Sequence, residues 1–153
     1  MARAFIGIGS NEGDRLAHIS RAVQALRDTP GITVTALALV RETIPVGGPP
    51  QGPYLNTAVA LDTSLAVEPL LDTLRRIERE GGRLLSRVRN APRPIDLDLL
   101  LYADQVVKTE TLEVPHPRLH ERRFVLEPLV DLDPALRHPV LDRSVQELLH
   151  ACD

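Results

Sequence analysis

The sequence of 153 residues lacks the features that mark membrane-spanning, secreted and disulfide-rich proteins. Its one cysteine, Cys152, cannot form an internal disulfide, which favours a reducing compartment. No apolar run is long enough to span a bilayer, and the apolar stretch near the N-terminus is too short for the core of a signal peptide. We therefore expect a cytoplasmic protein without a membrane partner.

Aromatic residues and lysine are also scarce. There is no tryptophan, the aromatic residues are Phe5, Tyr54, Tyr102 and Phe124, and Lys108 is the single lysine. No glycine-rich loop ends in Gly-Lys-Ser or Gly-Lys-Thr, which excludes a P-loop kinase. The net charge of −3 argues against a nucleic-acid partner, since such binding normally needs a basic excess.

The basic residues that are present concentrate in one stretch. Seven of the 18 lie between positions 75 and 93, and all seven are arginines. Arginine presents a planar fork of donors that matches phosphate oxygens. A local arginine concentration in an acidic chain favours a polyanionic small molecule as the ligand, rather than a long polyanion.

The hydrophobic pattern predicts one α+β domain over residues 1–153. The length suits a single core, and the composition (43% hydrophobic, 25% charged) is ordinary for a globular protein. The patterns predict strands at 4–8, 32–42, 55–61, 95–101, 105–107 and 112–114, and helices at 16–26, 68–80, 119–130 and 145–151. Alternating elements followed by clustered strands favour a mixed or antiparallel sheet.

Two segments between these elements are predicted to be lids over a site. Residues 43–53 hold four prolines and three glycines, and residues 83–93 hold four arginines with few large aliphatic side chains. Neither composition can bury much surface by itself. We therefore expect ligand contacts to order both segments.

The sharpest local motif is Ile95-Asp96-Leu97-Asp98-Leu99. Side chains alternate faces along a strand, so both carboxylates project from one face, about 7 Å apart. Such hard oxygen ligands suit Mg²⁺, which keeps several waters and shares phosphate oxygens with a nucleotide. A solvated outer strand face is the alternative for any isolated Asp-x-Asp.

The arginine-rich loop runs directly into this strand. Arg83, Arg89 and Arg93 precede Asp96 by thirteen, seven and three residues. Metal-binding acids beside guanidinium donors are what a bound triphosphate needs on its two sides. The alternative is an ordinary charged loop.

The other arginines of the stretch are expected to form a charged helix surface. Their spacing from two glutamates predicts the ion pairs Arg75–Glu78 and Arg76–Glu80.

Two aromatic rings and a few polar side chains suit a flat heterocycle. Tyr54 and Phe124 could stack on it, while the amide of Asn56 reads its polar edge as donor and acceptor. His116 could hydrogen-bond a phosphate. Core packing for the rings, and a surface turn for the histidine, are the alternatives.

The glycines at positions 7, 9 and 13 approach a dinucleotide-binding pattern without matching it. Their spacing, G-x-G-x-x-x-G, is one residue longer than the fingerprint. We expect these glycines to serve a tight turn between a strand and a helix.

Taken together, these residues resemble the 6-hydroxymethyl-7,8-dihydropterin pyrophosphokinase family. The matching segments follow the family order: 5–11, 54–59, 76–78, 82–83, 93–99 and 114–128. The Arg-Pro-x-Asp-x-Asp-x-Leu element followed by Val-Pro-His is the most specific of them. At Leu85, Asn90 and Ala91 the sequence departs from well-known members.

The resemblance implies a ferredoxin-like core with α/β/α layers around a mainly antiparallel sheet. It implies Mg-dependent transfer of pyrophosphate from ATP to the pterin hydroxymethyl group, with AMP released. Two Mg²⁺ ions are assigned to Asp96 and Asp98, and ATP to Glu78, Arg83, Arg89, Arg93, His116 and Arg122. The pterin is assigned to Thr43, Pro45, Val46, Tyr54, Asn56 and Phe124. Arg83, Arg93 and Asp98 are the expected catalytic residues.

Two other functions remain open at this point. An NAD(P)-dependent oxidoreductase would use the glycine turn and Glu42, but would leave the aspartate pair unexplained. A nucleotide-sensing module would use the same site without turnover. We expect the pyrophosphokinase to be a monomer.

Overall fold

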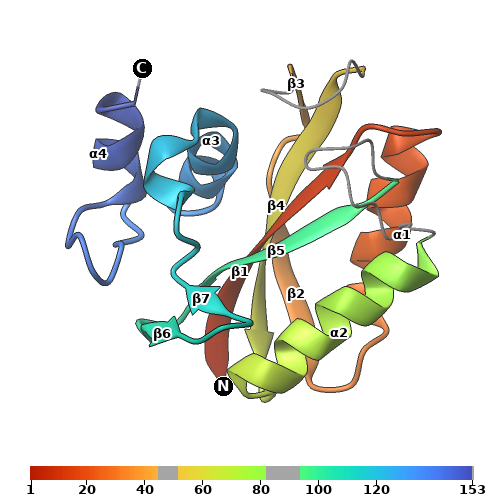
Figure 1. Ribbon diagram of the computed structural model, residues 1–153, viewed down its shortest axis with the longest axis horizontal. Coiled ribbons are helices and arrows are strands. Elements are labelled where there is room, and N and C mark those ends of the chain that lie inside the picture. Colours follow the sequence, from red (N-terminus) through yellow and green to blue (C-terminus); the bar gives the residue numbers. More distant parts are fainter. Residues whose placement is uncertain (45–51, 82–93, 153) are drawn as a thin grey trace.

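The computed structural model describes residues 1–44, 52–81 and 94–152. Its centre is a five-stranded sheet in which every pairing is antiparallel. Four strands follow the order β2-β4-β1-β5. The short β3 pairs with β4 on the same edge as β2 (Figure 1). The strands are β1 (Ala2–Ser10), β2 (Ile32–Leu37), β3 (Arg41–Thr43), β4 (Tyr54–Thr63) and β5 (Asp96–Tyr102).

Helices cover both faces of this sheet (Figure 1). One face carries α1 (Arg15–Arg27) and α2 (Val67–Glu80), and the other carries α3 (Arg123–Leu132) and α4 (Val145–His150). A 3₁₀ helix, η1 (Leu119–Glu121), precedes α3, and β6 (Val107–Lys108) pairs with β7 (Glu113–Val114). The order β1-α1-β2-β4-α2-β5 is the β-α-β-β-α-β arrangement of ferredoxin-like folds. The predicted α+β fold is therefore confirmed.

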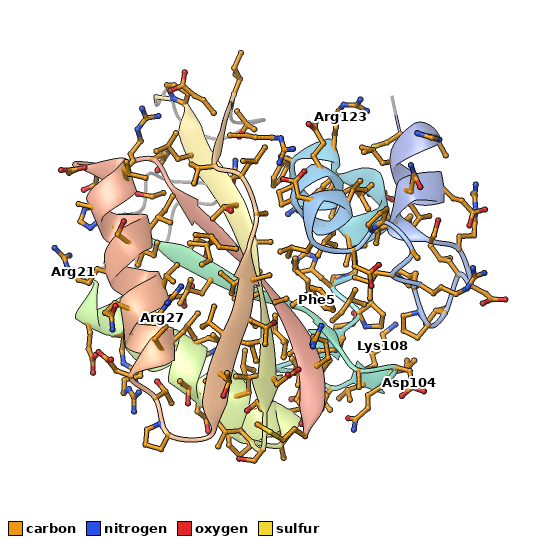
Figure 2. All side chains as sticks on the ribbon, turned by 180° about the vertical axis from the view of Figure 1, so that it is seen from behind. Phe5, Arg21, Arg27, Asp104, Lys108 and Arg123 are labelled. Atoms are coloured by element: carbon orange, nitrogen blue, oxygen red, sulfur yellow. The ribbon has the colours of Figure 1, made fainter. Side chains whose placement is uncertain are left out.

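Two hydrophobic cores fill the spaces on either side of the sheet. Neighbouring residues of β1 point to opposite faces, so Ile6 packs beneath α1 and α2 while Phe5 packs beneath α3 and α4 (Figure 2). Full burial of one such side chain contributes about 1.5–3 kcal/mol. The first core includes Leu26, Leu61, Leu70 and Leu74, and the second includes Leu100, Leu119, Leu126 and Leu129.

The predicted strand 32–42 is two strands in the structure. The pairing of β2 with β4 shifts register between Val34 and Ala36, and Ala38 lies between β2 and β3, where its N–H donates to the carbonyl of Ala58 at 2.9 Å. The Val- and Thr-rich pattern could not show this interruption, because it depends on the partner strand.

The predicted helix 119–130 also divides. Arg122 has an extended backbone (φ −111°, ψ 105°), which ends η1 and starts α3. Arg122 therefore lies at the junction between the two helices, and Phe124 in the first turn of α3.

A bulge at Leu100 corrects a third expectation. The alternation of 95–101 places Leu97, Leu99 and Leu101 on one face. In the structure, Ile6 pairs with Leu99 and Phe5 with Leu101, so one extra residue of β5 is accommodated. Leu101 consequently belongs to the core beneath α3 and α4.

Candidate active site

A cavity of about 440 Å³ lies between the sheet and the start of α3. It is lined by two aspartates and one leucine of β5, three residues of β4, one of β3, three of β1 and several around the start of α3. Among the predicted site residues, the structure brings together Thr43, Tyr54, Asn56, Asp96, Asp98, Arg122 and Phe124.

The aspartates of β5 lie opposite glycines of β1. Asp96 pairs with Gly9 and Asp98 with Gly7, while Leu97 between them packs into the core on the other face. The predicted one-face geometry is thus present, since both carboxylates line the cavity.

The glycines have a role in the strand that sequence reasoning assigned to a turn. Gly7 and Gly9 lie within β1, and only Gly13 (φ +68°) lies in the turn before α1. A Cβ at Gly9 would stand 3.0 Å from Oδ1 of Asn56, so glycine leaves room for that amide beside the strand. With β1 antiparallel to both neighbours, this is not a dinucleotide-binding βαβ unit.

The two aspartates form a donor set that fits Mg²⁺. In the described part of the chain, no group of three or more His, Cys, Asp or Glu side chains is arranged to hold a metal ion. Mg²⁺ does not need a full protein cage, because it is commonly bound by one or two carboxylates together with waters and substrate phosphates. Asp96 and Asp98 at the cavity wall match that requirement.

The β3–β4 side of the cavity is held by a side-chain hydrogen bond. Nδ2 of Asn56 donates to Oγ1 of Thr43 across the short pairing in which Thr43 lies opposite Tyr54. This bond orients the Asn56 amide next to the Tyr54 ring. On one wall, the fixed amide can hydrogen-bond to the edge of a flat ligand, and the ring can stack on its face.

The opposite wall is formed by the start of α3. The guanidinium carbon of Arg122 lies 5.6 Å from the centroid of the Phe124 ring, a cation–π distance. Burial and the nearby Arg118 charge lower the pKa of Arg122, but an arginine remains protonated at any physiological pH. Phe124 is 38% exposed, so its ring is available to a ligand.

Sequence reasoning missed other charged residues of this wall. Arg118, Glu121 and Arg123 also line the cavity. Three arginines within positions 118–123 are the sequence signal for this wall, beside the larger cluster at 75–93.

His116 is half-buried close to these arginines without lining the described cavity. Its backbone N–H donates to the carbonyl of Leu100 at 3.0 Å, and its ring Nδ1 accepts from the backbone N–H of Arg118 at 3.3 Å. Burial, followed by the charge of Arg122, lowers the pKa of His116. The ring is therefore neutral near pH 7, and the Nδ1 contact assigns the proton to Nε2.

Glu78 has a different environment from the one that its spacing suggested. It is 5% exposed, and its Oε2 accepts a hydrogen bond from the N–H of Leu97 at 2.8 Å. The predicted surface pair Arg75–Glu78 is therefore wrong, and Arg75 instead donates to the carbonyl of Thr111 at 3.3 Å. The predicted pair Arg76–Glu80 is confirmed at 3.7 Å.

Several predicted residues lie outside the described part of the chain. They are Pro45, Val46, Arg83, Arg89 and Arg93, the departures Leu85, Asn90 and Ala91, and most of both predicted lids. Within the described residues, none of the helices has the length and apolar character needed to cross a membrane.

Comparison with known proteins assigns this arrangement to a family. Residues 5–134 match the model of the 7,8-dihydro-6-hydroxymethylpterin-pyrophosphokinase (HPPK) family. The 2-amino-4-hydroxy-6-hydroxymethyldihydropteridine pyrophosphokinase of Aquifex aeolicus is 37% identical over 96% of this chain and 90% of its own length. The Bacillus subtilis enzyme of the same name is 45% identical over 84% of this chain and 77% of its own.

Solved structures show the same fold. A Plasmodium falciparum HPPK-DHPS crystal structure superposes with a TM-score of 0.74 at 14% identity, covering 98% of this chain. A wild-type structure of that protein with pterin and p-hydroxybenzoate gives a TM-score of 0.75 at 15% identity. The present chain spans 45% and 42% of these two solved chains, so the likeness concerns that part of them.

Proposed function

The chain belongs to the HPPK family, and from this membership we propose how its residues divide the work of the reaction. The protein is an ATP-dependent diphosphotransferase of folate biosynthesis. It transfers pyrophosphate from ATP to the hydroxymethyl group of 6-hydroxymethyl-7,8-dihydropterin and releases AMP.

The observation that carries the division of roles is the mixed lining of the cavity. The aspartates of β5 and the residues Tyr54 and Asn56 of β4 line it on either side of the β1 glycines, and Phe124 lines it from α3. The carboxylates suit a phosphate chain that carries Mg²⁺, and the rings with the amide suit a flat heterocycle.

We propose that the pterin stacks between Tyr54 and Phe124. Asn56, oriented by Thr43, would pair with donors and acceptors on the pterin edge. The family resemblance adds the backbone near Pro45 and Val46 to this subsite.

Asp96 and Asp98 are proposed to hold two Mg²⁺ ions together with phosphate oxygens. Bound Mg²⁺ neutralises phosphate charge and so lowers the cost of bringing an oxygen nucleophile to phosphorus. The protein's own contribution is to keep both carboxylates on one strand face, facing the cavity.

The phosphates are proposed to meet the basic wall of the cavity. Arg122 and the neutral His116, whose Nε2 carries a proton, would donate to phosphate oxygens. Arg118 lines the same wall and is a further candidate donor. The resemblance adds Arg83, Arg89 and Arg93, whereas Glu78 would act through its contact with β5.

The reaction forms a bond between the pterin hydroxymethyl oxygen and the β-phosphorus of ATP. The bond from that phosphorus to the bridging oxygen of the α-phosphate breaks, and its electron pair leaves with AMP. The hydroxyl proton has to be accepted, and Asp98 at the cavity wall is the proposed acceptor. Positioning and charge neutralisation supply most of the rate enhancement, with Arg83 and Arg93 contributing at the phosphates.

Incubation with ATP, MgCl₂ and hydroxymethyl-dihydropterin tests this proposal. We expect AMP and pterin pyrophosphate in equal amounts, and neither when the pterin is omitted. Ligand binding without AMP would instead support the nucleotide-sensing module. Release of ADP would contradict pyrophosphate transfer.

We also propose that residues 1–153 act as one cytoplasmic domain and as a monomer, without nucleic-acid or membrane partners. The described residues support a single unit, because both hydrophobic cores pack against the same sheet. Sedimentation velocity would test the monomer directly, with 16.9 kDa as the expected mass.

A further inference from the structure

Arg41 joins β3 to α3 through a set of charged contacts. Its two terminal nitrogens lie 2.7 and 2.8 Å from the carboxylate oxygens of Asp131, a bidentate geometry. Its Nε lies 3.4 Å from Glu127, which is also 3.3 Å from Nε of Arg123. We refer to Arg41, Arg123, Glu127 and Asp131 as the Arg41 network.

The network lies alongside the proposed pterin subsite. Positions 123, 127 and 131 are four residues apart and therefore share one face of α3. Arg123, at the outer end of that helix in Figure 2, is also a cavity-lining residue. On the other side, Arg41 is two residues before Thr43, so the network connects the wall that carries Thr43 with the wall that carries Phe124.

Asp131 restrains the backbone as well as the side chain of this segment. Its Oδ2 accepts from the N–H of Leu39 at 3.2 Å in addition to the guanidinium of Arg41. The hydrogen bond from Arg41 lowers the pKa of Asp131, and the same bond raises the pKa of Arg41. The side chains of Arg41 and Asp131 are only 28% and 23% exposed, so the pair is better shielded than an ordinary surface pair.

β3 is short, and its other contacts hold it to β4 and α1: Thr43 accepts from Asn56, and Glu42 pairs with Arg15 at 3.1 Å. Its three residues all pair with β4. The Arg41 network is what links it to α3. The helix, by contrast, docks without the network, since Leu126 and Leu129 of α3 are fully buried in the core. Loss of the network should therefore leave the fold intact and free β3 and the charged face of α3 to move relative to each other.

We propose that Arg41 is a positioning residue that sets the separation of the two pterin-binding walls. Its contact with Asp131 fixes the Thr43–Tyr54 side relative to Phe124, and stacking on both faces of a flat ring requires that separation to be held closely. This inference rests on the proposed function, because it takes the pterin to be the ligand between these walls.

The test compares Arg41→Met, Asp131→Asn and the double variant in the AMP-release assay. Methionine keeps an unbranched apolar side chain without the charge, and asparagine retains an acceptor for the N–H of Leu39. Each variant should raise the KM for pterin roughly three- to tenfold, while kcat and the KM for ATP change less than about twofold. The double variant should be no worse than either single variant, because both remove the same contact.

Arg3→Met is the matched control. Arg3 also pairs with an aspartate, Asp62, at 2.7 Å, but near the end of β4 remote from Tyr54. We expect wild-type kinetic constants for it. Arg41→Lys, which keeps the charge but not the fork, should be intermediate between wild type and Arg41→Met.

The outcomes separate this inference from the function on which it rests. An active wild type with an unchanged pterin KM in Arg41→Met would overturn the positioning role alone. So would equal losses for ATP and pterin, or additive losses in the double variant. A wild type that releases no AMP would overturn the proposed function and this inference with it.

Discussion

Asp96 and Asp98, the proposed metal ligands, lie on one face of β5, and the packed core lies on the other. The carboxylates line the cavity, and Leu97 between them is 4% exposed in the core on the other face. Substitution at either aspartate should therefore affect chemistry much more than folding. The glycines opposite them keep that side of β1 free of side chains.

We predict that Asp96→Asn and Asp98→Asn each lower kcat at least about 100-fold while changing pterin affinity little. Asparagine keeps the shape but removes the negative charge that a divalent ion requires. AMP release and calorimetry with the pterin measure the two effects. Asp104→Asn, on the exposed turn after β5 (Figure 2), is the control. Near-normal turnover in either site variant would refute the metal assignment.

The two rings of the cavity lead to a second prediction at this scale. Tyr54→Ala and Phe124→Ala should each weaken pterin binding about two- to tenfold and leave ATP binding nearly unchanged, since stacking contributes about 0.5–1.5 kcal/mol per ring pair. Calorimetry with each ligand separately decides the matter. Equal losses for both ligands would indicate a damaged fold instead of a lost stacking contact.

At the scale of elements, α2 and β5 meet through a buried carboxylate. Within the described residues β5 lies at one edge of the sheet, so some of its backbone N–H groups have no neighbouring strand there. Glu78 of α2 accepts one of these, from Leu97 between the two aspartates. A helix thereby helps to hold the strand that carries the proposed metal ligands.

We predict that Glu78→Ala destabilises the protein by about 1–3 kcal/mol, because it leaves the Leu97 N–H buried without this acceptor. It should also reduce kcat, since the strand segment 96–98 loses a restraint. Glu78→Gln retains an acceptor oxygen and should be milder in both respects. Urea denaturation and AMP release measure the effects.

Glu80→Ala provides the control for this prediction on the same helix. Glu80 has a side chain that is 66% exposed and makes a weak pair with Arg76. Its loss should cost well under 1 kcal/mol. If Glu78→Ala proved as stable and active as Glu80→Ala, the bond to Leu97 would have no role in holding β5.

At the scale of the whole molecule, the region from Arg118 onward supplies one wall of the cavity and contains a buried histidine. His138 is 6% exposed, and its Nδ1 accepts from the N–H groups of Val140 and Leu141 at 3.2 and 3.1 Å. Its ring meets that of His120 edge-on, with centroids 6.2 Å apart. His120 belongs to η1, which also carries the cavity residue Glu121.

Acid should therefore destabilise the fold through His138. Burial, followed by the neighbouring His120, lowers the pKa of His138 in the folded state. The unfolded chain then binds the proton more readily than the folded protein does. The contribution of His138 to the free energy of unfolding is therefore complete above the ordinary histidine pKa of about 6.5, and it is lost as the pH falls below that value. His138→Asn, which keeps an acceptor without a titrating ring, should show a flatter pH dependence of unfolding free energy.

Urea titrations between pH 5 and pH 8 would measure this dependence. The exposed His150, changed to asparagine, controls for the loss of a histidine in general. Parallel pH profiles for wild type and His138→Asn would contradict the assignment.

The sequence by itself determined what depends on short spacing. Period-2 alternation predicted the common face of Asp96 and Asp98, and apolar periodicity predicted α1 and α2 nearly to their ends. The motif set that resembles the pterin pyrophosphokinases also identified Thr43, Tyr54, Asn56 and Phe124 before the structure brought them to one cavity. These signals are local because they arise from backbone geometry repeated every two or every 3.6 residues.

Only the tertiary structure decided the contacts between distant segments. The bulge at Leu100 depends on the partner strand β1. The hydrogen bond from Leu97 to Glu78 joins residues 19 positions apart, and the contact of Arg41 with Asp131 joins residues 90 positions apart. The spacing of charges along α2 predicted a solvated position for Glu78, because such spacing considers only neighbours on the same helix. Whether a charged side chain faces water or another element depends on where that second element packs, and no period in the sequence carries that information.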